Sequence, residues 1–260
     1  MEDLSHYNPE GSVLRKAQMR LLEMLDIFVN ICDKHNITYW LVCGTLLGAR
    51  RHGGFIPWDD DLDVAILQSD YNRLISILKE ELPEDLKIQT RETDKNYWYF
   101  HPKIRDTGSR LQGVRNFEHT GIFLDIFLLE AVPSMGFKKI IDKFLLGEIH
   151  FKGARSLSHK IKYGIMLCFL PIINLIIKLS RLYYRYISGK KIYAYSYGYW
   201  QYPNYNMKYF FPVGETMFEG KKYKAPNNID KYLIDNFNAD FMVIPKPEDR
   251  AKHALGIDFH

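Results

Sequence analysis

Residues 39–66, YWLVCGTLLGARRHGGFIPWDDDLDVAI, decide the fold of this 260-residue chain. Two glycine-containing turn signals are followed by four aspartates within five residues and then by a short apolar run. Asp61 and Asp63 flank Leu62, and because residues two apart on a strand share a face, both carboxylates would project from one side. Neighbouring carboxylates raise each other's pKa unless a cation neutralises them. Since hard cations prefer oxygen ligands, the pattern predicts a Mg²⁺ or Mn²⁺ site.

Three other interpretations of these aspartates compete with a metal site. Asp59 and Asp60 directly precede the pair, and aspartates in such turns are often solvated and inert. A calcium loop beginning at Asp59 would place Val64 where the sharp turn needs glycine and Asp70 where glutamate is expected. A helix N-cap at Asp61 is disfavoured, because a helix does not begin with alternating apolar and acidic residues.

The run GTLLGARRHGGFIPWDDDLDVAI (44–66) resembles the signature of the LicD family, relatives of the fukutins within the nucleotidyltransferase-fold superfamily. That superfamily combines a Gly-Ser or Gly-Thr turn with an acidic-apolar-acidic strand and a third carboxylate on a later strand. Gly44-Thr45 is similar to the turn and 61–63 to the acidic strand. Asp125, in the middle of the apolar run GIFLDIFLL, is similar to the third carboxylate.

A further stretch that resembles the family lies near the C-terminus. It reads FEGKKYKAPNNIDKYLIDNF (218–237), followed by FMVIPKPEDRAKH (241–253). The family commonly has a Tyr-Gly step where this chain has Asn236-Phe237. Altogether the resemblance covers about residues 15–130 and 205–253.

The resemblance implies an α/β (α+β) fold, in which a nucleotidyltransferase-like mixed β-sheet is flanked by helices. Apolar residues recur at three- and four-residue spacings in 13–34 and 70–81, which predicts two amphipathic helices. A hairpin that turns near Glu219-Gly220 and a final helix over 228–237 are expected, together with strands at 37–42, 61–66, 86–90 and 121–129. We expect one domain over residues 1–260, with a helical insertion at about 136–190.

The insertion contains the most apolar stretch of the chain, YGIMLCFLPIINLIIKL (163–179), with basic residues on both sides. Its continuous apolar length is below the roughly 20 residues that a membrane-spanning helix needs. A buried helical hairpin and a segment lying in an anionic leaflet both stay open for 163–187. The tyrosine-rich segment 193–209 either lines an acceptor groove or packs in the core.

Composition narrows the class of protein. Hydrophobic residues make up 47% and charged residues 25%, which is an ordinary globular balance. A net charge of +4 does not predict nucleic-acid binding but suits anionic nucleotides, phosphorylated glycans or an acidic membrane surface. Three cysteines without a CxxC pair argue against a disulfide scaffold, and the polar N-terminus lacks the apolar region of a signal peptide. We expect a cytoplasmic protein, with peripheral contact to the inner face of the cytoplasmic membrane left open.

The resemblance implies a LicD-type phosphotransferase. Its family transfers phosphocholine, ribitol phosphate or a similar phospho-alcohol from a CDP-activated donor to a hydroxyl of a glycan or lipid-linked glycan, and releases CMP. The implied setting is assembly of lipopolysaccharide, capsule polysaccharide or teichoic acid. Two rival functions stay open: a true nucleotidyltransferase that releases pyrophosphate, and a non-catalytic glycan- or nucleotide-binding protein.

The same resemblance assigns roles to particular residues. Asp61, Asp63 and Asp125 are expected to hold two Mg²⁺ or Mn²⁺ ions, which would clamp the attacking and leaving oxygens. Asp125 is also expected to help take the proton of the acceptor hydroxyl. Gly44 and Thr45 would hold the diphosphate through backbone N–H groups at a helix start.

Six further residues are candidates for substrate binding, and most have a structural alternative. Lys103 and Arg105 would share a strand face near the phosphates or form an ordinary solvated face. His52 is either a general acid or a positioned surface residue. Trp58 could stack on a base, face a quaternary ammonium through cation–π attraction, or only pack. Arg50 and Arg51 complete this set as cations near the diphosphate.

Overall fold

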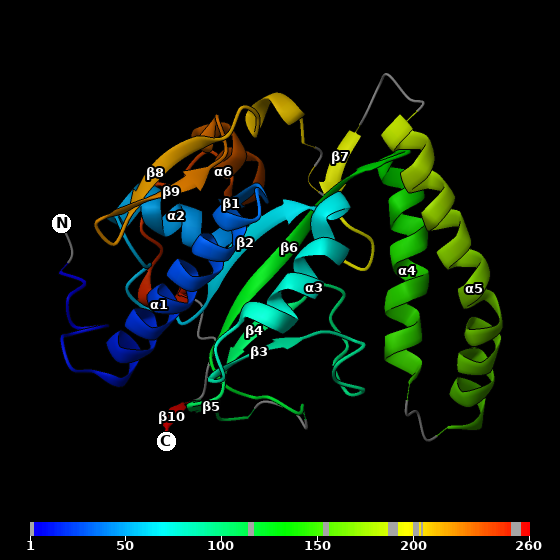
Figure 1. Ribbon diagram of the computed structural model, residues 1–260, viewed down its shortest axis with the longest axis horizontal. Coiled ribbons are helices and arrows are strands. Elements are labelled where there is room, and N and C mark those ends of the chain that lie inside the picture. The colour runs from blue at the N-terminus through cyan, green and yellow to red at the C-terminus, as the bar shows by residue number, and fades with distance from the viewer. Residues whose placement is uncertain are drawn as a thin grey trace. The chain divides into compact units, whose positions relative to one another are not determined.

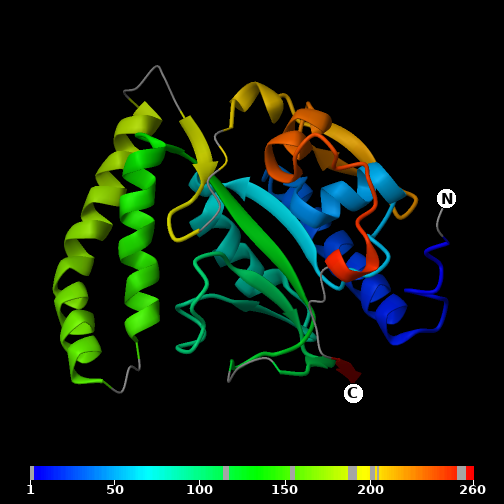
Figure 2. The same cartoon turned by 180° about the vertical axis from the view of Figure 1, so that it is seen from behind.

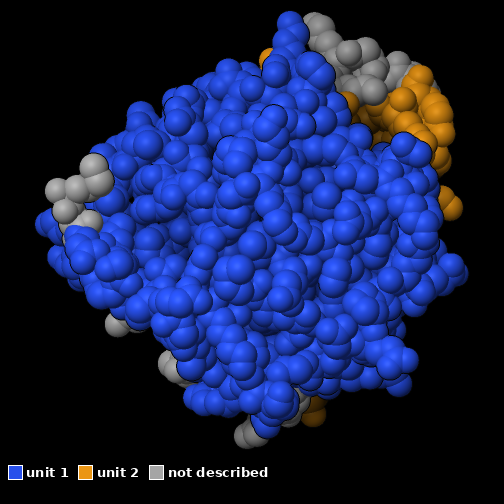
Figure 3. All heavy atoms as spheres, turned by 60° about the vertical axis from the view of Figure 1, so that its left-hand side comes forward, with its two compact units in different colours: residues 1–128, 207–260 blue, residues 129–206 orange. Residues whose placement is uncertain are grey.

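The computed structural model describes residues 3–113, 117–152, 156–186, 192–199, 203, 205–250 and 256–260. The chain divides into two compact units, which Figure 3 colours separately. Unit 1 comprises Met1–Leu128 and Met207–His260, and unit 2 comprises Leu129–Asn206. Helices and a mixed sheet are present, so the predicted α/β class is confirmed. The organisation as a single domain stays a prediction.

The main sheet of unit 1 has the strand order β1-β2-β6-β4-β3. The pairs β1–β2, β6–β4 and β4–β3 are antiparallel, whereas β2 and β6 run in the same direction (Figure 1). A hairpin and a small two-stranded ladder complete the strands of this unit. The bounds are β1 Tyr39–Leu41, β2 Leu62–Leu67, β3 Leu86–Gln89, β4 Lys103–Asp106, β5 Ser109–Leu111, β6 Phe123–Val132, β8 Gly214–Phe218, β9 Lys221–Ala225 and β10 Ile257–Phe259.

Helices α1 (Val13–Lys34) and α3 (Tyr71–Glu81) lie on the same face of this sheet (Figures 1 and 2). Both are amphipathic as predicted, because their apolar stripes are buried and their polar sides are exposed. Ser12 caps α1 by accepting a hydrogen bond from the backbone N–H of Arg15 at 3.1 Å. The other elements of unit 1 are α2 Cys43–His52, α6 Ile229–Phe237, η1 Gln68–Asp70, η2 Met207–Tyr209 and η3 Pro247–Asp249.

Helix α2 contacts β2, β8 and α6, so residues more than 150 positions apart surround the stretch that follows β1. The hairpin β8–β9 turns at Glu219 and Gly220, as predicted, and both have positive φ (48° and 78°). Gly220 suits this conformation because it has no Cβ. The Glu219 carboxylate accepts hydrogen bonds from the backbone N–H of Phe55 at 3.0 Å and from Arg15 at 2.7 Å. The β8–β9 turn is therefore tied to α1 and to the loop after α2.

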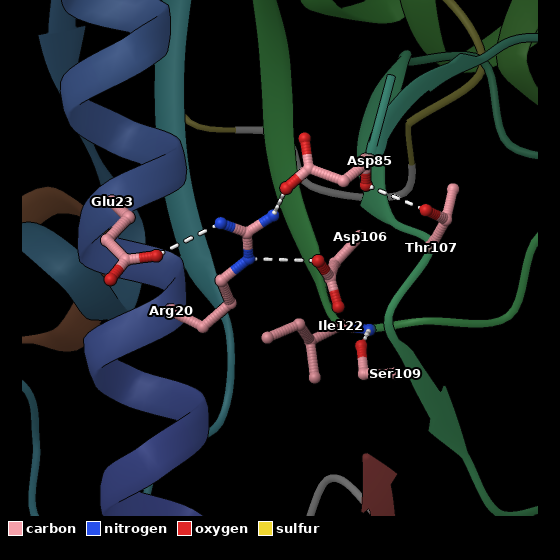
Figure 4. A network of polar contacts seen from close by, with 7 residues as sticks. All are labelled: Arg20, Glu23, Asp85, Asp106, Thr107, Ser109 and Ile122. Atoms are coloured by element: carbon pink, nitrogen blue, oxygen red, sulfur yellow. Dashed lines mark hydrogen bonds and ion pairs between the residues drawn. The ribbon is translucent and has the colours of Figure 1, made fainter. Parts of the chain in front are cut away.

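A second polar contact, the Arg20 network, joins α1 to the end of the β3–β4 edge (Figure 4). Three guanidinium nitrogens of Arg20 each meet one carboxylate: Nε lies 2.9 Å from Asp106, Nη1 lies 3.0 Å from Glu23, and Nη2 contacts Asp85. The backbone carbonyl of Asp85 also accepts hydrogen bonds from the N–H and the hydroxyl of Thr107. The network thus fastens the long helix to the sheet.

Unit 2 consists of α4 (Met135–Phe151), α5 (Leu157–Tyr186) and β7 (Ile192–Tyr195), which pairs antiparallel with the end of β6. Two ion pairs lie within this unit. Lys138 contacts Asp142 one helical turn away, and Arg181 lies 2.6 Å from Glu130 of β6. In the tyrosine-rich segment, the buried side chains are Tyr195, Tyr197, Tyr199 and Tyr205, which therefore pack in a core; Trp200 and Tyr202 lie outside the described residues.

The structure of helix α5 contradicts one of the two interpretations of the apolar segment. The segment 163–187 was weighed as a buried hairpin, but the structure has a single 30-residue helix with Pro171 inside it, and only 6% of its apolar window is buried. The buried hairpin is therefore wrong. In the described parts of the chain, α5 is the one helix long and apolar enough to cross a membrane, judged by length and composition only.

Candidate active site

Strand β2 places Asp63 against the first turn of α2. The backbone N–H of Asp63 donates a hydrogen bond to the Thr45 hydroxyl at 2.7 Å, and this contact is buried. A Cβ on Gly44 would lie 2.9 Å from Oδ2 of Asp59 and 3.9 Å from Oδ2 of Asp63. Glycine at this position therefore allows the helix backbone to approach two carboxylates closely. Gly44 and Thr45 belong to the helix itself, which begins at Cys43, and do not form a separate turn before it.

We call Asp59, Asp61, Asp63 and Asp125 the aspartate cluster. Asp59, Asp63 and Asp125 are buried, and Asp61 is half-buried. Burial raises the pKa of Asp63 well above its ordinary value, and the charges of Asp61, Asp125 and Asp59 raise it further. Burial also raises the pKa of Asp59, with the charges of Asp61 and Asp60 as the next causes. The four side chains thus share one electrostatic environment.

The burial of Asp59 and Asp60 overturns another expectation. Both were weighed as solvated turn residues, but only 7% and 8% of their surfaces are exposed. Their place after Pro57 suggests a turn in the sequence, and a turn is usually solvated. Here the first turn of α2 lies against Asp59, because a Cβ on Gly44 would be only 2.9 Å from its Oδ2. Asp59 is therefore a member of the site that sequence reasoning set aside.

Asp125 differs from the other members because Lys103 and His101 contact it. Lys103 lies directly opposite it in the β4–β6 pairing, and its Nζ is 2.5 Å from Oδ1 of Asp125. Nε2 of His101 lies 3.2 Å from the same oxygen. Burial alone would raise the pKa of Asp125, but the charges of Lys103 and His101 and their hydrogen bonds hold it well below its usual range. Asp125 therefore stays ionised at neutral pH.

Sequence reasoning did not include His101 among the site residues. The side chain is buried and its ring stacks on Phe127 at a centroid distance of 4.9 Å. Burial lowers the pKa of His101 despite the nearby Asp125 charge. The sequence did contain a pattern that could have identified His101. His101, Lys103 and Arg105 recur at a spacing of two and therefore share one face of an extended segment.

Lys103 and Arg105 are both buried, so the ordinary solvated face weighed for them is wrong. Their cationic ends lie 3.6 Å and 4.6 Å from the centroid of Phe123, one ring between them. Arg105 donates hydrogen bonds to the side-chain oxygen of Gln89 at 2.8 Å and to the carbonyl of Gly121 at 2.7 Å. Lys103 thus reaches the aspartate cluster, while Arg105 is engaged in holding β3 and β6 together.

The basic end of α2 is engaged elsewhere in unit 1. Arg50 forms an exposed ion pair with Asp230 of α6 at 2.8 Å. Arg51 donates a hydrogen bond to the backbone carbonyl of Phe241 at 2.9 Å. Burial, together with the charge of Arg51, lowers the pKa of His52 to about 4, so its ring is neutral at pH 7. A neutral imidazole of low pKa is a poor general acid for a leaving phosphate.

Trp58 directly precedes the aspartates and already faces a cation. The guanidinium carbon of Arg250 lies 4.6 Å from its ring centroid, and the ring of Tyr7 lies 5.4 Å away. Arg250 is itself buried. Its side chain also donates hydrogen bonds to the Tyr7 hydroxyl and to the Pro245 carbonyl. This cation–π contact links the C-terminal segment to the site.

The aspartate cluster offers carboxylate oxygens in the chemistry that Mg²⁺ and Mn²⁺ prefer. Within the residues that the structure describes, no three His, Cys, Asp or Glu side chains are grouped closely enough to hold a metal ion. The donor chemistry and the excess negative charge around Asp63 fit a divalent cation, whereas Asp125 is bound to Lys103. Asp59, Asp61 and Asp63 supply this donor chemistry, although among the described residues their side chains are not gathered into a ligand set.

Residues 36–144 match the model of the LicD/FKTN/FKRP nucleotidyltransferase domain. The chain carries a LicD-family domain. The aspartate cluster, Gly44, Thr45 and Lys103 all lie within this domain, as do the elements from β1 to β6. Helices α5 and α6 lie outside the matched residues.

Two named relatives and one uncharacterised protein share parts of the sequence. The lipopolysaccharide cholinephosphotransferase LicD of Haemophilus influenzae is 28% identical over 275 residues, which cover 93% of this chain and 96% of that protein. The ribitol 5-phosphate transferase FKRP of Mus musculus is 44% identical over 69 residues, or 26% of this chain and 14% of FKRP. An uncharacterised protein of Rickettsia prowazekii is 43% identical over 79 residues, 30% of this chain and 28% of that protein.

Proposed function

We propose that this protein transfers a phospho-alcohol group, such as phosphocholine or ribitol phosphate, from a CDP-activated donor to a hydroxyl of a cell-surface glycan precursor. CMP is the released product. The LicD-family domain and two relatives named as transferases of cholinephosphate and ribitol 5-phosphate indicate a phosphotransferase. The match over nearly the whole length of the lipopolysaccharide enzyme favours a glycan or lipid-linked glycan as the acceptor, assembled on the cytoplasmic side of the membrane.

The observation that carries the proposal is the electrostatic state of the aspartate cluster. Burial and three neighbouring carboxylates raise the pKa of Asp63, so the ionised cluster is unfavourable without a cation. Asp61, Asp63 and Asp59 would hold Mg²⁺ or Mn²⁺. When bound, such ions neutralise the phosphates and stabilise the charge that develops on the transferred group.

Residues at the start of α2 would position the donor. Gly44 keeps a side chain out of the space beside Asp59 and Asp63, so that a phosphate and its cation can approach the backbone. Thr45 holds the strand that carries Asp63 through a 2.7 Å hydrogen bond. These residues would therefore keep the ligand-binding carboxylates in register with the helix start. Placing the donor in line with the hydroxyl supplies much of the catalysis in phosphoryl transfer.

Asp125 would remain ionised and would position Lys103. Lys103 and His101 hold its pKa well below the usual range, and a carboxylate of low pKa accepts a proton poorly at neutral pH. This disfavours the role in proton removal that the family resemblance implied. Asp125 would instead fix Lys103 beside the cluster, where the ammonium can meet a donor phosphate.

The test combines ligand binding with product identification. Purified protein is melted with CDP-choline, CDP-ribitol, CDP-glycerol or CMP, each with and without Mg²⁺, and a metal-dependent rise in Tm with one CDP-alcohol names the donor. Incubation of that donor with a glycan acceptor should release CMP. Release of pyrophosphate from a nucleoside triphosphate would instead identify a nucleotidyltransferase, and no turnover of any donor would leave a binding protein. Asp63→Asn should abolish the metal-dependent shift, and Asp240→Asn, an exposed aspartate of the same unit, should not.

A further inference from the structure

We propose that helix α5 docks this protein onto an anionic membrane surface, independently of the transfer reaction. One side of α5 packs in unit 2, where the Met166 side chain approaches α4 so closely that a Cβ on Gly147 would lie 2.7 Å from it. Ile177 is the one residue of the helix that is fully buried. Large apolar side chains are exposed along the whole helix and include Ile161, Ile165, Phe169, Ile172, Leu175 and Leu179.

The size of this surface requires a partner. Phe169 and Leu175 expose 52% and 54% of their surfaces, and the exposed apolar residues Ile165, Ile172 and Leu179 lie one helical turn from one or the other. Monomeric proteins in water rarely expose a continuous apolar patch of this kind, since it lowers solubility and promotes association. Single exposed apolar residues would need no explanation, but a stripe along a 30-residue helix does.

The charge of α5 identifies the partner as an anionic surface. The helix contains no aspartate or glutamate, and its basic residues flank the apolar centre: Lys160 and Lys162 on one side, Lys178, Arg181 and Arg185 on the other. Arg181 is turned toward Glu130 and is engaged within unit 2. The exposed cations Lys160, Lys162, Lys178 and Arg185 are each attracted to an anionic leaflet.

A second copy of the chain fits this surface less well. Two α5 helices packed antiparallel would bring Lys160 and Lys162 of one copy beside Lys178 and Arg185 of the other. Packed parallel, they would bring identical cations together. Neither arrangement supplies a carboxylate from α5, because the helix has none, so both pair like charges. A leaflet with anionic headgroups neutralises the same residues.

The arrangement also favours lying on the membrane over crossing it. The uncharged part of α5 runs from Tyr163 to Ile177, about 22 Å at the helical rise, which is shorter than the roughly 30 Å hydrocarbon core. Along its packed side runs α4, which carries the buried pair Lys138 and Asp142. An amphipathic association with the headgroup region leaves this pair within the protein.

The first experiment measures flotation of the full-length protein with vesicles of phosphatidylcholine alone or with 30% phosphatidylglycerol. We expect binding to the anionic vesicles, and a fall of at least tenfold in the partition coefficient for Phe169→Glu with Leu175→Glu. Val243→Glu, at an apolar site of unit 1 that is 66% exposed, is the control and should bind as the unchanged protein does. Lys178→Gln with Arg185→Gln should weaken binding about thirtyfold. Equal binding by all variants would overturn the proposal.

A second experiment does not depend on the folding of a variant. Cys168 is an exposed thiol in the centre of α5 and can carry a polarity-sensitive fluorophore, with Cys168→Ser as the labelling control. Interfacial docking predicts a blue shift on adding anionic vesicles and strongest quenching by shallow lipid quenchers. Strongest quenching from the bilayer centre would show a spanning helix instead. If the fluorescence does not shift and the protein forms concentration-dependent dimers that Phe169→Glu disrupts, a second copy covers the surface. Either result would overturn the proposal.

Discussion

The aspartate cluster and the Arg20 network are both groups of carboxylates near one basic residue, yet they differ in what surrounds them. In the Arg20 network, each of three guanidinium nitrogens meets its own carboxylate, and Glu23 and Asp85 are 64% and 54% exposed. In the aspartate cluster, Asp59, Asp63 and Asp125 are buried, and the ammonium of Lys103 contacts Asp125. In the Arg20 network two of the three carboxylates are solvated and all three meet the guanidinium, even though Asp106 is buried. The aspartate cluster instead carries excess negative charge away from water.

This difference distinguishes a group of carboxylates that stabilises the fold from one that binds a ligand. In the Arg20 network, a guanidinium nitrogen compensates each carboxylate, and solvent surrounds Glu23 and Asp85. Burial and like charges make the ionised aspartate cluster unfavourable, as the raised pKa values of Asp59 and Asp63 indicate. A group of acidic residues therefore points to a ligand when it is buried and undercompensated.

The largest effect is expected when Lys103 is removed from beside Asp125. Lys103→Met would leave Asp125 buried beside His101, and breaking a buried ion pair typically costs about 3–5 kcal/mol of stability. Urea unfolding of the variant measures this loss. The double variant Lys103→Met with Asp125→Asn should recover part of the stability, because it removes both charges. A single variant as stable as the unchanged protein would contradict the ion-pair assignment.

Asp63→Asn should separate function from stability. We expect transfer activity to fall by about 10²–10³-fold, the range seen when one electrostatic contact to a transition state is removed. Without divalent cations the Tm should rise, since the substitution removes a charge whose ionisation burial disfavours. A transfer assay and a thermal melt on the same preparation test both expectations, with Asp240→Asn as the control. A lower Tm with retained activity would assign Asp63 to the fold alone.

The pH dependence of metal binding should follow from the two directions of pKa shift. The raised pKa of Asp63 means that its ionisation destabilises the native state, so this penalty is absent at low pH and grows as pH rises through the folded-state pKa. The lowered pKa of Asp125 means that its ionisation stabilises the native state. This stabilisation is present at neutral pH and is lost only as pH falls through the folded-state pKa of Asp125. Saturating Mg²⁺ should add about 2–3 kcal/mol at neutral pH. Melts from pH 4 to 8 should show this increment shrinking toward acid, and a pH-independent increment would place the cation elsewhere.

The smallest effect is expected in the Arg20 network. Glu23→Gln with Asp85→Asn would remove the two ion pairs whose carboxylates are exposed, which together contribute about 1 kcal/mol, and would leave the pair between Arg20 and buried Asp106 in place. Specific activity per folded molecule should stay unchanged, because none of these residues belongs to the aspartate cluster. Unfolding in 0.1 M and 1 M NaCl measures the loss, which should be smaller at high salt. A large fall in activity would show that the two groups are coupled.

Much of the fold was predictable because its signals are local. The spacing of apolar residues predicted α1 and α3, and the Glu219-Gly220 pair predicted the β8–β9 turn. The motif around 61–63 and the apolar run around Asp125 indicated two strands that carry carboxylates, and these strands are neighbours in the sheet. Helix α5 was less predictable, because an apolar run has the same sequence pattern whether protein, membrane or another chain covers it.

The sequence by itself determined which chemical groups the site can contain and on which elements they lie, because side-chain alternation and helix periodicity are set by residues close together in the chain. Tertiary structure decided which of those groups meet. It brought Lys103 and His101 to Asp125 across the β4–β6 pairing, buried Asp59 against Gly44, and turned Arg50, Arg51 and Arg105 toward other partners. Burial and charge pairing depend on contacts between distant segments, and it is these contacts that set the pKa values on which the chemistry rests.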